Sequence, residues 1–416
     1  MPKTHKRLPA FAVDMSVPVK GEPSAIVSAE QVVAFRLSRH HLARRSSSSA
    51  LPRVAGDMVG VQAQVMAAAR MSLWARTRGL RSDDVGAALW RDRTLAKVWC
   101  MRGTTHLVPS EDVTLFTRGC TRRANRSIAW MMRAGVPGDS IEPAVEIVRE
   151  ALDRPLTRKE LADRLAKAHR TTTRRFVEVG WGSRSVSTGL EVRGTVVSLS
   201  DAVFLGCMRG ILVAGPEKGN EATFVRTDAW LPRGRDLTVE RAESELLRRY
   251  LRAYGPAMIS DFAMWTYMTA ADAREIWARN DRELARVDVD GRPGWVLRSD
   301  VSPLERARLE PGVLRLLPHF DTYLLGHKDK GHLVDAAHYK RVYRAAGWLS
   351  PVLLVSGRAA GVWSHEREGR RLAVRIEPFK PLPRSLRSAI DEEADGLRRF
   401  LGAADVSVRV TSVARP

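Results

Sequence analysis

Cysteine is scarce in this sequence. The three cysteines, Cys100, Cys120 and Cys207, lie far apart and form neither a Cys-x-x-Cys pair nor a spacing with histidine that would suit a metal ion. This pattern argues against a disulfide framework, a structural zinc site and an iron–sulfur cluster. We therefore predict a protein without a metal site.

Long apolar runs are missing as well. No stretch approaches the roughly 18 consecutive apolar residues that a membrane-spanning helix needs. The N-terminus also lacks a compact apolar stretch followed by a small-residue cleavage site. We therefore expect a cytoplasmic protein with no membrane partner.

Acidic residues are in deficit, because 47 Asp and Glu face 68 Lys and Arg and leave a net charge of +21. The excess is spread along the chain rather than gathered in one tail, so folded surface must carry it. Such a surface favours a polyanionic partner, and DNA or RNA is favoured over an anionic membrane. With 44% hydrophobic residues over 416 positions, the chain can bury a core in two or three structural units.

A helical pattern recurs along the chain. Its clearest copy joins an amphipathic segment at 142–152 to a second one at 156–168, where Thr157 and Glu160 have the spacing of a capping box. Two helices around a tight break are typical of a helix-turn-helix. A single copy would fit the solvated faces of an ordinary helical protein equally well, and this alternative loses weight as copies are added.

Two further copies support the helix-turn-helix interpretation. The copy at 239–299 places three helical segments before two alternating strands that turn at Asp290-Gly291, which is the order of a winged helix. The copy at 82–109 is looser, with a short helix followed by two β-rich runs on either side of Gly103.

From these copies we predict an α+β fold of tandem winged helix-turn-helix units with a β-rich C-terminal part. The predicted segments are a disordered leader at 1–27, winged-helix unit 1 at 28–135, unit 2 at 136–235, unit 3 at 236–300, the β-rich part at 301–402 and a tail at 403–416. No heptad-patterned dimerisation helix stands out, so we expect a monomer.

Glutamine is rare too, and its placement is informative. Of three glutamines in the chain, Gln62 and Gln64 stand one residue apart. Side chains two positions apart share one side of an extended backbone but lie about 200° apart on a helix. A cooperating pair therefore requires an extended or turned backbone here, with the Ala- and Met-rich helix beginning just after it. Taken alone, composition favours two polar positions at the start of a helix.

The stretch VGVQAQVMAAARMSLWAR and the following KVWCMRGTTHLVPSEDV resemble winged-helix DNA glycosylases of the AlkZ and YcaQ type. LLPHFDTYLLGHKDK, GRAAGVW and RIEPFKPLP match in the same order, so the similarity extends from about residue 28 to 400. A Gln-x-Gln or Gln-x-Asp motif is the catalytic signature of that family, and Gln62-Ala63-Gln64 has the form of the AlkZ-like branch. The resemblance implies a monofunctional DNA glycosylase with Gln62 and Gln64 as its catalytic pair and no cofactor.

Neutral amides suit this reaction, because a purine alkylated on its imidazole ring is already cationic and leaves without a strong acid. A glutamine cannot be a general base, but its carbonyl can orient the attacking water and its dipole can face the oxocarbenium-like sugar. The resemblance implies double-stranded DNA with bulky alkylated purines of the N7-alkylguanine type as the partner, in repair or in self-resistance to a DNA-alkylating antibiotic. It leaves open whether interstrand cross-links are cut as well.

The first wing supplies candidate DNA contacts. Arg102, Thr104, Thr105 and His106 lie at its hairpin, and a basic hairpin can grip phosphates or wedge a groove. Thr105 fits an ordinary strand position equally well. Trp181, which glycines flank, is the tryptophan most typical of a surface aromatic that touches a base or lesion.

A loop near the C-terminal part supplies the remaining candidates. By resemblance, it lines the DNA cleft with Asp321, His327, Lys328 and Lys330. A buried Asp321 that caps a turn is an equally good interpretation of that residue.

Two other functions stay open from the sequence. The winged helices could read a DNA sequence in a transcription regulator, for which a two-fold dimer on paired half-sites is expected. The chain could also bind and sequester adducted DNA without cutting it. Release of a modified base from damaged DNA would separate the glycosylase from both.

Overall fold

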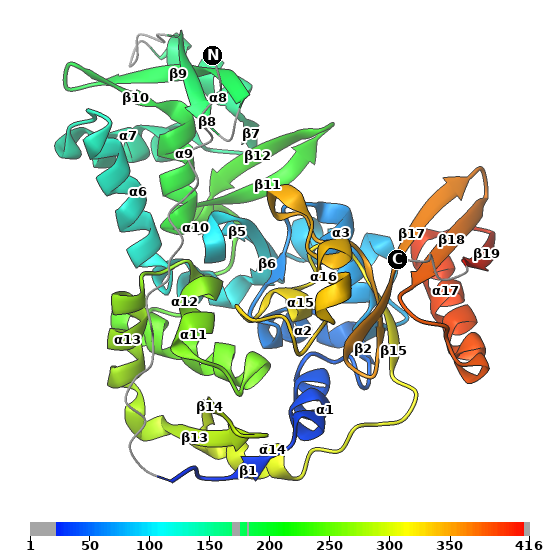
Figure 1. The fold of residues 1–416 in the computed structure, drawn as a ribbon. Coiled ribbons are helices and arrows are strands. Elements are labelled where there is room, and N and C mark those ends of the chain that lie inside the picture. Colours follow the sequence, from blue (N-terminus) through cyan, green and yellow to red (C-terminus); the bar gives the residue numbers. More distant parts are fainter. Residues whose placement is uncertain (1–21, 169–174, 181–182, 412–416) are drawn as a thin grey trace, which may run out of the picture.

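The computed structural model describes residues 22–168, 175–180 and 183–411, with the backbone alone described for 175–180 and 183–187. Helices and short strands alternate along the chain, so the fold is α+β, as predicted. Figure 1 shows three groups of helices, each next to a small sheet, and a further sheet near the C-terminal end. The three groups are called the first, second and third unit below.

The first unit carries the two glutamines. Its elements are β2 (Ser46–Ser47), α2 (Leu51–Asp57), β3 (Val61–Gln62), α3 (Met66–Trp74), β4 (Thr77–Arg78), α4 (Ser82–Gly86), β5 (Leu95–Trp99), β6 (Thr105–Pro109) and α5 (Val113–Arg118). Helix α6 (Thr121–Arg133) leads to the second unit, where it lies beside α7 (Gly138–Ala151) and α9 (Leu199–Met208), as Figure 1 shows. The two β-rich runs around Gly103 pair as the antiparallel hairpin β5–β6, as expected. Strand β3 pairs with the other edge of β6.

The second unit begins with the clearest helix pair of the sequence. Its elements are α7 (Gly138–Ala151), β7 (Leu156–Thr157), α8 (Arg158–Lys167), β8 (Arg175–Gly180), β9 (Ser183–Val192), β10 (Thr195–Ser198), α9 (Leu199–Met208), β11 (Leu212–Lys218), β12 (Glu221–Arg226) and α10 (Thr227–Trp230). The predicted capping box is confirmed: Thr157 Oγ1 accepts from the Glu160 N–H at 3.1 Å, and Glu160 Oε2 accepts from the Thr157 N–H at 2.8 Å. These bonds satisfy N–H groups that the first turn of α8 would leave free.

The third unit follows the predicted order of three helices and a hairpin. Its elements are α11 (Val239–Tyr254), α12 (Ile259–Thr266), α13 (Ala270–Arg279), β13 (Leu284–Val289), β14 (Arg292–Leu297) and α14 (Val301–Glu305). The hairpin turns where the sequence indicated, since Asp290 (φ 47°) and Gly291 (φ 81°) both adopt the left-handed conformation of a tight β-turn.

The second unit also holds the sheet β10-β9-β8, and one other sheet in each of the three units has a common topology. In each, a short strand lies beside the second strand of a hairpin, giving the orders β3-β6-β5 and β7-β12-β11. In the third unit, the short strand is reduced to a bridge between Ala257 and Trp295 of β14. This repeated order places the first glutamine on the short strand of the first unit.

Both ends of the described chain are paired with strands. Strand β1 (Ile26–Val27) lies parallel to β13, and β19 (Asp405–Val410) lies parallel to β18 (Arg371–Pro378). The predicted leader therefore ends before residue 24, whose N–H donates to Arg286 O, and the predicted tail contains a strand. The alternating valines of β19 suit a strand that adds to the free edge of β18, and the sequence alone does not reveal that this edge is available.

The C-terminal part shares its core with the first unit. Its elements are β15 (Leu314–Leu317), α15 (Thr322–Leu325), α16 (Tyr339–Val342), β16 (Val352–Val355), β17 (Arg358–Glu368), β18, α17 (Arg387–Leu401) and β19. Buried residues from 37–107 and from 313–403 form one hydrophobic cluster. Helix α1 (Ala29–Arg39) instead packs on β13 and β14 through Val32 and Phe35. The core thus crosses the segment boundaries that the sequence suggested.

Candidate functional site

The two glutamines alternate with two buried residues where strand β3 ends. Val61 and Ala63 are fully buried, whereas Gln62 is partly exposed and Gln64 is exposed. The Ala63 N–H donates to Thr105 O at 2.7 Å, which continues the pairing of β3 with β6. Helix α3 begins two residues after Gln64, as expected. Both amide side chains are therefore accessible, whereas the residues that alternate with them are buried.

Arg102 holds the first of these amides. It lies in the turn between β5 and β6 with φ 54°, and its side chain folds back instead of projecting from the hairpin. The guanidinium Nη2 donates to Gln62 Oε1 at 2.7 Å, and the guanidinium carbon lies 4.2 Å from the ring centre of Trp265. Burial lowers the pKa of Arg102 to about 10, which leaves the group protonated at neutral pH. Arg102 is therefore part of the glutamine site, and because its side chain is partly exposed its contact with DNA stays a prediction.

His106 contacts the same guanidinium nitrogen of Arg102 that holds Gln62. Its Nδ1 lies 3.1 Å from Thr104 O, and its Nε2 lies 3.1 Å from Arg102 Nη2. A carbonyl only accepts, so Nδ1 carries the proton and Nε2 accepts from the guanidinium. Burial, helped by the nearby charge of Arg102, holds the pKa of His106 well below its ordinary value. The imidazole is therefore neutral and orients the arginine without competing for its charge.

This contact fixes the direction of the Gln62 amide. Arginine has five N–H donors and no acceptor, so the Gln62 atom that faces Arg102 must be the carbonyl oxygen. The Gln62 amide nitrogen then points away from Arg102. Gln64 makes no side-chain hydrogen bond within the described part of the chain, so its carbonyl and amide are both free.

Asp321 anchors the helix that follows the glutamines. Its carboxylate forms a fully buried bidentate ion pair with Arg76, with both N–O distances at 2.7 Å, and accepts from the hydroxyl of Ser72 on α3. It also caps α15 by accepting from the Tyr323 N–H at 3.0 Å. The ion pair ties the end of α3 to the C-terminal part, which explains why these two regions share one core.

Four predicted DNA contacts are buried. The exposed fraction is 4% for Thr105, 0% for His106, 0% for Asp321 and 6% for His327. The imidazole of His327 contacts the carbonyl of Tyr254 at 2.8 Å. Because these side chains have no surface to offer a phosphate or a base, the prediction that they touch DNA directly is wrong, and the turn-capping alternative for Asp321 is the correct one.

The other candidates keep some accessible surface or lie outside the described residues. Lys328 is exposed, and Thr104 is partly exposed with its hydroxyl donating to Met101 O at 3.3 Å. Lys330 donates to the carbonyls of Leu325 and His327, and burial lowers its pKa to about 7. Trp181 lies outside the described residues. DNA contacts by Lys328, Lys330 and Thr104 stay predictions.

The described part of the chain holds no group that would indicate metal chemistry. There, no cluster of three or more His, Cys, Asp or Glu side chains could hold a metal ion. The three cysteines are buried and unpaired, and burial raises the pKa of Cys100 and of Cys207 to about 12. None of the described helices combines the length and apolar character that crossing a bilayer requires.

Comparison with known proteins places this chain in a family. The family model for AlkZ-like DNA glycosylases matches residues 55–400. The interstrand DNA cross-link repair glycosylase of Streptomyces sahachiroi is 32% identical over 397 residues, which cover 91% of this chain and 98% of that protein. The solved structure of Streptomyces sahachiroi DNA glycosylase AlkZ matches with a TM-score of 0.75 and 28% identity, covering 93% of this chain and all of that one. This chain therefore belongs to the AlkZ-like family and is a DNA glycosylase.

Proposed function

We propose that the protein hydrolyses the N-glycosidic bond of bulky alkylated purines in double-stranded DNA, with Gln62 and Gln64 as its catalytic pair. Adducts of the N7-alkylguanine type are the proposed substrates. The relative from Streptomyces sahachiroi is named for interstrand cross-link repair, so cross-links joined through such guanines are included. The single observation that carries the proposal is that both amides are accessible, two positions apart at the end of β3, with Gln62 held by Arg102.

The two amides have different tasks in this reaction. Because Arg102 occupies the Gln62 carbonyl, Gln62 presents its N–H groups and donates to the oxygen of the attacking water. The free carbonyl of Gln64 accepts a hydrogen bond from the same water and faces the positive charge that develops on the sugar. Two contacts of opposite polarity hold the water against C1′.

The reaction balances without a cofactor. The water oxygen bonds to C1′ while the bond from C1′ to N9 breaks, and the electron pair of that bond neutralises the cationic purine as it leaves. The surplus proton of the water passes to solvent, since neither amide can retain it. The protein therefore supplies orientation and electrostatics rather than acid catalysis.

Incubation with a duplex that carries one N7-alkylguanine tests the proposal. Free alkylated base should appear in the supernatant, and an abasic site should remain in the strand. The variant Gln62→Ala/Gln64→Ala, purified in parallel, controls for contaminating glycosylases. Binding of the damaged duplex without release of base would favour a protein that only sequesters adducts.

The transcription regulator is a weaker candidate. It would read sequence as a two-fold dimer, whereas we propose a monomer of three winged-helix units that binds through phosphates. Sedimentation of the protein alone and on DNA separates the two, because a stable dimer on paired sites would support the regulator.

A further inference from the structure

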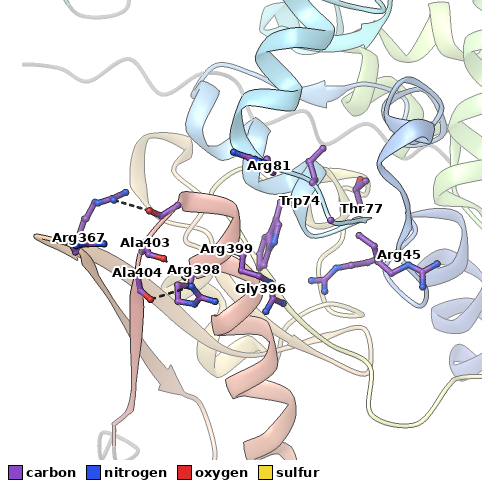
Figure 2. Close-up of a pocket in the computed structure, with 15 residues that line it drawn as sticks. Arg45, Trp74, Thr77, Arg81, Arg367, Gly396, Arg398, Arg399, Ala403 and Ala404 are labelled. Carbon is purple, nitrogen blue, oxygen red and sulfur yellow. Dashed lines mark hydrogen bonds between the residues drawn. The ribbon is translucent and has the colours of Figure 1, made fainter.

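A strongly basic pocket lies apart from the glutamine site, where the first unit meets the C-terminal part. It has a volume of about 840 Å³ and lies between the end of α3, strand β4 and the turn after it on one side, and the β17–β18 turn and the end of α17 on the other. Figure 2 shows Arg367 and Arg398 on one side and Arg45 and Thr77 on the other. Seven arginines line it and no acidic residue does: Arg45, Arg78, Arg81, Arg367, Arg370, Arg398 and Arg399.

The charge of this pocket is poorly neutralised. Arg45 pairs with Glu393 at 2.7 Å, and Arg398 and Arg399 share Asp395. The other four have no acidic partner in the described part of the chain; of these, Arg78, Arg81 and Arg370 are exposed and have no side-chain hydrogen bond there. Seven guanidinium groups therefore face two carboxylates, and like charges held this close repel unless an anion lies between them.

Backbone carbonyls hold part of the pocket in place. Arg367 donates to the carbonyls of Leu401 at 3.0 Å and Gly402 at 3.3 Å, at the end of α17. Arg398 donates to Ala403 O at 3.2 Å and Ala404 O at 3.4 Å. These bonds satisfy carbonyls at and just beyond the helix end and leave the positive charges in fixed positions, so an anion would be bound without first ordering these two side chains.

Helix α3 links this pocket to the glutamines. The helix starts two residues after Gln64 and ends at Trp74, whose indole lines the pocket. Its nine residues at 1.5 Å each separate the two places by about 14 Å. Along duplex DNA this is about four base pairs at 3.4 Å each. When the damaged nucleotide of a duplex lies at Gln62 and Gln64, phosphates about four base pairs away in the flanking arm are at the distance of the pocket.

We propose that the arginine pocket binds the phosphate backbone of the duplex arm that flanks the damaged nucleotide. The number and spread of the arginines suit several phosphates in a row rather than one small anion. This proposal rests on DNA as the substrate and not on which base is excised.

The test uses the variant Arg78→Ala/Arg81→Ala/Arg370→Ala and undamaged duplex DNA, with Kd measured over a range of salt. Each phosphate contact contributes about 0.9 to the slope of log K against log salt, so the slope should fall by about 2 to 3. At physiological salt the affinity should drop about 10- to 100-fold.

The variant Arg241→Ala/Arg282→Ala/Arg306→Ala is the matched control. It also removes three exposed arginines without an acidic partner in the described chain, and they lie around α11, α13 and α14, far from α17 in Figure 1. Because Arg241 and Arg282 lie in a winged-helix unit that also has DNA as its proposed partner, the slope of this control should fall, but by less than the slope of the pocket variant. An equal loss in both variants would mean that net charge alone matters and would overturn the proposal.

Duplex length supplies the second measurement. On a hairpin duplex with about three base pairs on either side of the damaged site, the pocket variant and the wild type should bind with equal affinity. When each arm is lengthened to about ten base pairs, the pocket variant should bind more weakly than the wild type. Equal binding on the short duplex also shows that the variant is folded. If the two proteins bind long duplexes with the same slope, the pocket does not bind DNA. Failure of the catalytic proposal would appear instead as absent base release with this salt dependence intact.

Discussion

Replacing Arg102 by methionine isolates the contact that orients Gln62. Methionine preserves packing against Trp265 but cannot donate to Gln62 Oε1, which Arg102 contacts at 2.7 Å. Freeing the glutamine returns up to about 1.5–2 kcal/mol of rotamer entropy. At about 1.4 kcal/mol per tenfold in rate, single-turnover excision should slow by roughly 10- to 30-fold. DNA affinity should stay within a few-fold, because phosphate contacts supply most of the binding.

A double-mutant cycle separates orientation from a general structural effect. Adding Arg102→Met to Gln62→Ala should slow excision no further, because the group that Arg102 orients is already gone. Arg93→Met is the matched control, since Arg93 also has a left-handed backbone (φ 52°) and lies over a tryptophan, Trp230, at 3.9 Å. The reasoning is refuted if Arg102→Met excises at the wild-type rate, or if its effect adds fully to that of Gln62→Ala.

Three further predictions follow from the same contacts. Gln62→Ala and Gln64→Ala should each slow base release by about 10²–10³ with DNA affinity within a few-fold, and single-turnover rates beside binding titrations check this. Asp321→Asn leaves a buried guanidinium unpaired and should lower the free energy of unfolding by about 3–5 kcal/mol in urea titrations, far more than Asp335→Asn in an exposed pair. Burial holds the pKa of His106 below its ordinary value of about 6.5, so the unfolded chain binds a proton that the folded chain does not. The free energy of unfolding should therefore decrease as pH drops below 6.5, by about 1.4 kcal/mol per pH unit from this residue. In the variant His106→Gln the free energy of unfolding should decrease less steeply with falling pH.

The sequence predicts the glutamine geometry well because the signal is local. Two rare side chains at i and i+2 require an extended backbone, and the Ala-rich segment after them favours a helix. Strand β3 and helix α3 have this order. The capping box at Thr157 and the turn at Asp290-Gly291 are also local patterns, and both are found where they were expected.

Side-chain roles at the site depend on partners far along the chain and were not predictable in the same way. Arg102 lies at the hairpin turn as expected, but its direction is set by Trp265, which is 163 residues away in sequence. Asp321 is buried because Arg76, 245 residues earlier, provides a matching charge. A polar residue in a loop looks the same in the sequence whether or not such a partner exists.

The short strand of each unit is used differently, and this difference bears on function. In the second unit it ends at Thr157, whose hydroxyl caps the helix that follows. In the first unit the residue before the corresponding helix, α3, is Val65, whose side chain cannot cap the helix. A missing cap costs a helix about 1 kcal/mol, so the first unit gives up local stability where it exposes Gln64. The buried ion pair of Asp321 at the other end of α3 compensates by anchoring the helix to the shared core. A functional site on a repeated scaffold is expected to lack a local stabilising feature, such as this helix cap, and to be stabilised instead by residues distant in sequence.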